Sequence, residues 1–137
     1  MKEILDNDFT SVYFDDISNS IITVWKKPTT SESYRAIYTF ILKKIKEFHA
    51  DSYISDIFYQ GLVPTENRLW LQTEIIPEAY AAGIRKVAIV APHDVFSRFY
   101  IESVKNGTES LTQEIEMRYF NDLVTAQGWL INQAVAV

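Results

Sequence analysis

The sequence predicts an α/β protein: a mixed sheet of five strands, opened by an N-terminal β-hairpin and continued by β-α repeats, with about four helices. The main observation lies at residues 70–92. A helical pattern ends at Gly83 and is followed within three residues by the apolar, β-branched run 87–91. A strand that is apolar at successive positions has both faces covered, so this run is expected at the centre of a largely parallel sheet. Strand-like and helical patterns also alternate along most of the chain.

Two β-rich runs come first, after a polar lead-in. Residues 9–15 and 20–26 are separated by Asp16, Ile17, Ser18 and Asn19, which have turn chemistry, so an antiparallel hairpin is predicted.

The first helix is predicted to follow Pro28 and to run to about Ala50. Thr29 and Glu32 have capping-box spacing. One apolar stripe recurs at helical spacing, at Tyr34, Ile37, Tyr38, Ile41, Ile45 and Phe48. The opposite face, with Arg35, Lys43 and Lys46, is interpreted as a solvated surface.

The next unit is a strand at 52–59, a loop at 61–64 and a helix over 65–83 with Thr65 as its N-cap. Its buried residues are predicted to be Leu69, Ile75, Ile76, Ala79 and Ala82. Pro77 is expected to kink or split this helix because proline lacks an N–H. Trp70 is expected to project away from the buried stripe.

The last elements follow Pro92. Asp94 is expected to cap a short helix or pair of turns, and residues 114–120 alternate as an edge strand with one wet face does. Asn121 is predicted to cap a final helix that buries Leu123, Ala126, Trp129 and Leu130.

Composition points to one ordinary globular domain over residues 1–137. The net charge of -5 disfavours nucleic acid as a partner. The N-terminus lacks the apolar core of a signal peptide, and there is no cysteine for disulfides. A soluble, cytoplasmic protein is therefore expected.

A resemblance to a known family is carried by two stretches, WLQTEIIPEAYAAGIRKVAIVAPHDVF and MRYFNDLVTAQGWL. They resemble the corresponding blocks of STAS/SpoIIAA-like proteins, whose founding members are anti-sigma-factor antagonists. That family shares its β-α superhelix with lipid-binding CRAL-TRIO domains. The resemblance covers nearly the whole chain and implies this fold and a role in regulatory protein interactions.

One departure from that family concerns phosphorylation. Its antagonists carry Asp-Ser-Ser-Gly where the third strand passes into its helix, and the first serine takes a regulatory phosphate. Here the junction reads GLVPTE over residues 61–66, and Thr65 is the only hydroxyl left. Thr65 is interpreted as a helix cap, with a phosphorylation switch as the alternative.

Candidate site residues gather where strands end. His93 and Asp94 follow the central strand, and Asp56 with Tyr59 should lie at the neighbouring strand end, where open α/β sheets bind ligands. No nucleophile elbow or glycine-rich phosphate loop is found, and two isolated histidines make no metal site. No catalytic residue and no cofactor is therefore predicted.

Two function classes remain. The first is a non-enzymatic regulatory module that binds a protein, or a second copy of itself, through a surface around Asp56, Thr65 and His93. The second is a carrier or peripheral membrane protein that takes up an apolar ligand or lipid beneath the kinked helix 65–83, with Trp70 and Pro77 involved. An elongated apolar cavity under that helix would favour the second class.

Overall fold

The structure, a computed structural model, describes residues 1–92, 102 and 114–135. Within those residues the elements in chain order are β1 (Lys2–Asp6), β2 (Thr10–Asp15), β3 (Ser20–Trp25), α1 (Ser31–Phe48), β4 (Ser52–Asp56), α2 (Thr65–Trp70), the π-helical turn η1 (Leu71–Ile75), α3 (Ile76–Ala81), β5 (Lys86–Val90), β6 (Glu116–Phe120) and α5 (Leu123–Val135).

The strands form one mixed sheet in the order β1-β2-β3-β4-β5-β6. The first three strands are antiparallel, and β3 to β6 are parallel. The register places Thr23 of β3 beside Ser55 of β4, and Ser55 beside Ile89 of β5. Because side chains alternate along a strand, these three neighbours lie on one face of the sheet.

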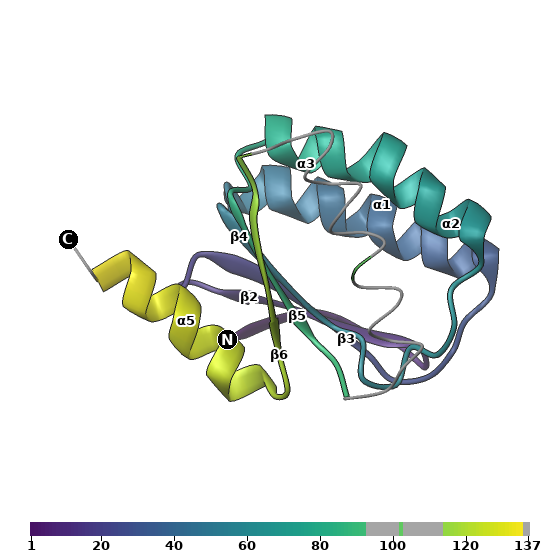
Figure 1. The fold of residues 1–137 in the computed structure, drawn as a ribbon, viewed down its shortest axis with the longest axis horizontal. Helices are drawn as coiled ribbons and strands as arrows, with labels where there is room; N and C mark the ends of the chain where they lie inside the picture. Colours follow the sequence, from purple (N-terminus) through teal and green to yellow (C-terminus); the bar gives the residue numbers. More distant parts are fainter. Residues whose placement is uncertain (93–101, 103–113, 136–137) are drawn as a thin grey trace.

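Helices cover both faces of this sheet (Figure 1). The apolar side of α1 and of the helical run from α2 to α3 packs on one face, in a core that includes Ile21, Trp25, Ile41 and Ile89. On the other face, α5 packs against residues such as Ile54 and Val90. The order of layers follows from the periodicity of each helix, since a helix with one apolar stripe must bury it against a sheet face.

Several predictions about the strands are confirmed. Strands β2 and β3 form the antiparallel hairpin, and β5 lies between β4 and β6. Both faces of β5 are covered, with Ala88 and Val90 almost inaccessible on one and Ile89 buried on the other. Among the described strands, β6 lies at the edge of the sheet, as its alternation indicated.

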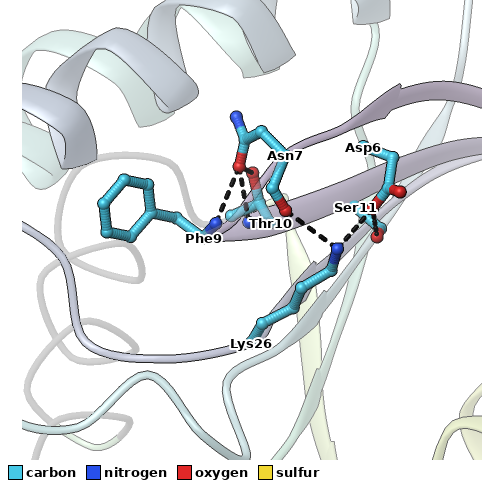
Figure 2. Close-up of polar contacts among 6 residues, drawn as sticks. All are labelled: Asp6, Asn7, Phe9, Thr10, Ser11 and Lys26. Carbon is cyan, nitrogen blue, oxygen red and sulfur yellow. Dashed lines mark hydrogen bonds and ion pairs between the residues drawn. The ribbon is translucent and has the colours of Figure 1, made fainter.

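The predicted number of five strands is wrong, because the lead-in forms β1. Figure 2 shows what attaches it: the Asn7 side-chain oxygen accepts hydrogen bonds from the Phe9 and Thr10 N–H groups at 2.8 and 2.9 Å. The Lys26 ammonium contacts the Asp6 carboxylate and donates to the Asn7 carbonyl at 2.8 Å. An Asx-type turn and an ion pair thus support the antiparallel pairing of β1 with β2.

The N-terminal caps of α1 and α5 each lie one residue away from the predicted position. Thr30, not Thr29, caps α1 by accepting from the Ser33 N–H at 3.1 Å. Asp122, not Asn121, accepts from the Thr125 N–H at 2.8 Å at the start of α5. The predicted inward residues of α5 are buried or half-buried.

The described residues contain three helical units: α1, the run from α2 to α3, and α5. The predicted helix or pair of turns capped by Asp94 lies outside the described residues. In the part of the chain that the structure covers, every helix is too short or too polar to cross a lipid bilayer.

Candidate functional site

Residues 65–81 form one helical run, called here the covering helix, in which α2, η1 and α3 follow each other without a break in helical backbone. At its middle the Ile76 N–H donates to the Leu71 carbonyl, five residues back, so the turn there is π-helical. Pro77 follows at once and has no N–H to donate. The break expected at Pro77 therefore takes the form of a π-turn, a feature frequent at functional sites.

The π-turn changes which residues of the covering helix face the sheet. Leu71 and Ile75 are buried, as is Asn67 one turn earlier, whereas Leu69 is 53% exposed. The prediction that Leu69 belongs to the buried stripe is wrong, because it assumed one α-helical period throughout. The added residue of the π-turn rotates the first half of the helix relative to the second.

An apolar cavity lies under the covering helix, between it, α1 and the sheet, and is called here the inner cavity. Its volume is about 80 Å³. Its described lining is mostly aliphatic and comes from every neighbouring element: Tyr38, Ile41, Ile45, Tyr53, Ser55, Ile57, Leu71, Ile75, Ile76, Ala79, Ile84, Val87, Ile89, Ile115 and Met117. No charged side chain occurs in this described lining. Leu71 and Ile75, the first and last residues of the π-turn, are both part of this lining.

Three residues of the lining carry a hydroxyl group: Tyr38 from α1, and Tyr53 and Ser55 from β4. All three residues are at least nine-tenths buried. The Tyr53 and Ser55 hydroxyl oxygens have no hydrogen-bond partner of normal geometry among the described residues, and the same holds for Thr23 and for both side-chain atoms of Gln60. A buried polar group without a partner costs about 1–3 kcal/mol.

Burial keeps the two phenol groups neutral. Burial raises the pKa of Tyr38, and burial followed by the nearby Tyr38 raises the pKa of Tyr53 well above its ordinary value. Ser55 and Gln60 lie near enough to Tyr38 to oppose that rise, although neither makes a hydrogen bond of normal geometry to it. Both phenols therefore stay protonated at neutral pH and can donate a hydrogen bond.

Trp70 is half-buried against α1, which corrects the prediction that it projects away from the core. Its ring lies 6.3 Å from that of Tyr34, edge-on, and the Arg35 guanidinium lies 5.2 Å from its centroid. Arg35 Nε also donates to the Asn67 side-chain oxygen at 3.2 Å, and Asn67 donates to Ser31 Oγ at 3.1 Å. Arg35 is therefore half-buried and joins α1 to the covering helix, instead of lying on a solvated face.

Thr65 is not the N-cap of the covering helix. Pro64 occupies that position, which has no side-chain capping bond, and Thr65 is the first helical residue. The exposed Thr65 hydroxyl instead accepts a hydrogen bond from Arg68 at 3.0 Å. Proline at the N-cap position supplies a fixed φ but no side-chain oxygen to accept a hydrogen bond. The sequence alone did not show whether Pro64 or Thr65 occupies that position.

The predicted strand-end residues do not gather into one site. Asp56 ends β4 and accepts from the Phe58 N–H at 3.1 Å, and burial raises its pKa. Strand alternation places Asp56 on the face of Ile54, which packs toward α5, whereas Thr65 and Trp70 lie in the layer on the opposite face. Tyr59 is exposed in the following loop. His93 and Asp94 lie outside the described residues.

The sequence reasoning missed Thr23, Ser55, Gln60 and Asn67 as buried polar residues. A signal existed for two of them, since Thr23 and Ser55 fall in strands of a sheet already expected to be covered on both faces. No cluster of side chains suited to a metal ion occurs among the described residues. No protein-family model, curated protein or solved structure matches the chain.

Proposed function

We propose that the chain is a non-enzymatic binding module that holds a small apolar ligand in the inner cavity, beneath the covering helix. The observation that carries the proposal is the cavity itself. Interiors are normally packed with few voids larger than a water molecule, whereas this cavity has a volume of about 80 Å³. A site that keeps such a volume lined by aliphatic side chains suits an apolar occupant.

The covering helix supplies the second support. Its π-turn lies directly over the cavity, where the regular helical bonding is interrupted next to Pro77. Such an interruption makes movement of the helix less costly than in a regular α-helix, so ligand entry and a change in the outer surface can be coupled. The raised pKa values of Tyr38 and Tyr53 favour binding over proton-transfer chemistry.

Xenon tests this function because it fills apolar cavities without forming hydrogen bonds. Methyl NMR under xenon pressure should show saturable shifts at Ile41, Ile75 and Ile89. Ala79→Leu, which adds three carbons to the lining, should abolish them, while Ala81→Leu, at an exposed position of the same helix, should not. Absence of saturable shifts in the unmodified protein would contradict the proposal.

A protein-binding surface is a second candidate, favoured by the loop after β4. Phe58, Tyr59 and Leu62 are all exposed there, and the rings of Phe58 and Tyr59 are tilted against each other with their centroids 5.1 Å apart. Exposed aromatic and apolar groups close together are typical of contact surfaces. The resemblance to STAS/SpoIIAA-like proteins, which we propose reflects a related fold, also favours a protein partner, with the sequential order β3-β4-β5-β6 as support.

A photo-crosslinking amino acid at position 59 tests this surface. It should give a discrete cross-linked species in cells of the native host, either a second copy or another protein. The same amino acid at position 17, where Ile17 is 71% exposed in a different loop, should not. Equal cross-linking from both positions would remove this candidate.

A further inference from the structure

We propose that α3 is the gate of the inner cavity: it moves outward about the π-turn and Gly83, while α2 stays fixed on α1. The inference rests on the proposed function and names the half of the covering helix that moves to admit the ligand. Its basis is a difference between the two halves in burial, in their contacts and in the segments that border them.

The N-terminal half, α2, is held on α1 by a buried polar contact. Asn67 is 1% exposed, and its side chain accepts from Arg35 Nε at 3.2 Å and donates to Ser31 Oγ at 3.1 Å. At the end of α2, Trp70 lies edge-on against Tyr34. Lifting α2 would therefore leave a buried amide without its partners, which is costly.

The C-terminal half, α3, is held less firmly. All six of its residues are described and none of them is buried, although Ile76 and Ala79 belong to the lining of the inner cavity. These two side chains are half-buried where they pack against the core. Since the cost of exposing a side chain grows with the apolar area that is newly exposed, α3 is the half that opens more easily.

A point at which the backbone can turn borders α3 on each side. Before it lies the π-turn, where the Ile76 N–H bonds to the Leu71 carbonyl and Pro77 has no N–H to continue the helical bonding. After it, Gly83 has a φ of +118°, and the Ala50 carbonyl oxygen is 4.0 Å from where a Cβ would lie. Hinges are typically a few residues at the ends of elements, so both borders suit this role.

One surface hydrogen bond joins α3 to another part of the cavity wall and is called here the latch. The Tyr80 hydroxyl donates to the Glu114 carboxylate at 2.5 Å, and the next residue, Ile115, lines the cavity. Because the latch is exposed, water can replace it at modest cost. Arg85 also donates to the Tyr80 carbonyl, at 2.8 Å, but it lies two residues beyond Gly83, at the hinge itself.

Amide hydrogen exchange followed by NMR locates the gate without any ligand. In the unmodified protein, amides 79–82 should exchange about tenfold faster than amides 68–71, after correction for intrinsic rates, because α3 opens locally. Tyr80→Phe should raise exchange at 79–82 by about threefold to tenfold and leave 68–71 within about twofold. Tyr59→Phe, which removes an exposed hydroxyl from a different loop, is the matched control and should change neither.

Xenon exchange, measured by NMR saturation transfer, connects the gate to the cavity. In Tyr80→Phe, entry and exit should both accelerate by about threefold to tenfold, while the affinity stays within about twofold because the closed cavity is the same. The chain has no cysteine, so Tyr80→Cys combined with Glu114→Cys can be joined by dibromobimane. The joined protein should exchange xenon at least about tenfold more slowly than the same variant before joining.

Equal amide exchange in the two halves of the covering helix, or exchange at 79–82 that Tyr80→Phe leaves unchanged, would overturn the gate. Xenon rates that are the same before and after joining with dibromobimane would also overturn it. In each of these cases the cavity function stands. If xenon fails to bind the unmodified protein, the proposed function falls, and with it the role of α3 as a gate, even where hydrogen exchange shows that α3 opens.

Discussion

The indole ring of Trp70 meets the phenol ring of Tyr34 edge-on, with the ring centroids 6.3 Å apart. This contact fixes the first half of the covering helix to α1. Trp25 and Tyr38 extend the same aromatic group, at 5.7 Å from each other, down to the sheet. The covering helix is therefore anchored at its N-terminal half, and its π-turn lies beyond that anchor.

Truncation of Trp70 tests the anchor. Trp70→Ala should lower the free energy of unfolding by about 2–3 kcal/mol, somewhat less than for a fully buried tryptophan because the ring is half-exposed. Urea denaturation followed by circular dichroism measures this without interference from Trp25 and Trp129. A loss below about 0.5 kcal/mol, together with weakened self-association, would show that Trp70 serves a surface contact instead.

Two threonine substitutions test the helix caps. Thr30→Ala should cost about 1 kcal/mol because Thr30 accepts from the Ser33 N–H, whereas Thr65→Ala should stay within about 0.5 kcal/mol because Thr65 caps nothing. Chemical denaturation of the two variants side by side gives the comparison. A larger loss for Thr65→Ala would mean that its contact with Arg68 matters more than the cap.

Removal of the buried Tyr53 hydroxyl tests whether it lacks a hydrogen-bond partner. Tyr53→Phe should leave stability unchanged or raise it by about 1 kcal/mol, since the deleted hydroxyl is buried and makes no hydrogen bond of normal geometry within the described part of the chain. Thermal and urea unfolding measure the change, with Tyr13→Phe as the matched control. A loss of more than about 1 kcal/mol would show that the hydroxyl is bonded in solution.

The stability of the folded protein should depend on pH through the carboxyl group of Asp56. Burial raises its folded-state pKa, outweighing the Phe58 N–H, so the folded chain holds this proton to a higher pH than the unfolded chain. Stability from this group is therefore lost as pH rises above the ordinary value of 3.8 and is regained on acidification. Asp56→Asn keeps the acceptor for Phe58 and should be the more stable protein at pH 7.

The advantage of Asp56→Asn should shrink as the pH falls toward 4. Urea denaturation at several pH values follows it. Asp16→Asn, in the exposed turn between β2 and β3, controls for the general benefit of removing a negative charge from an acidic chain. A stability advantage for Asp56→Asn that is independent of pH, or absent at pH 7, would contradict the assignment.

The α/β class, the hairpin and the covered position of β5 could be predicted because each depends on a local pattern. The apolar run 87–91 indicates a strand covered on both faces, and the apolar stripe on α1 indicates a helix packed on a sheet. Strand β1 could not be predicted in this way, because its sequence has no clear alternation and part of its support, the contact of Lys26 with Asp6, joins residues far apart in the chain.

The site was predictable only in outline. Pro77 indicated an irregular helix over a sheet, and a cavity beneath it was among the expectations. The π-turn that exposes Leu69 shifts the helical period by one residue, and no single-residue preference records such a shift. Asn67 and Gln60 are polar, so their sequence suggested exposed positions, whereas both are buried in the fold.

The central claim is that the inner cavity accepts an apolar occupant, and a crystal structure determined under xenon pressure tests it most directly. The claim predicts a xenon atom under the π-turn, in contact with Ile41, Ile75 and Ile89, and none there in crystals of Ala79→Leu. A cavity region filled by side chains and free of xenon, or xenon bound only elsewhere in the protein, would contradict it.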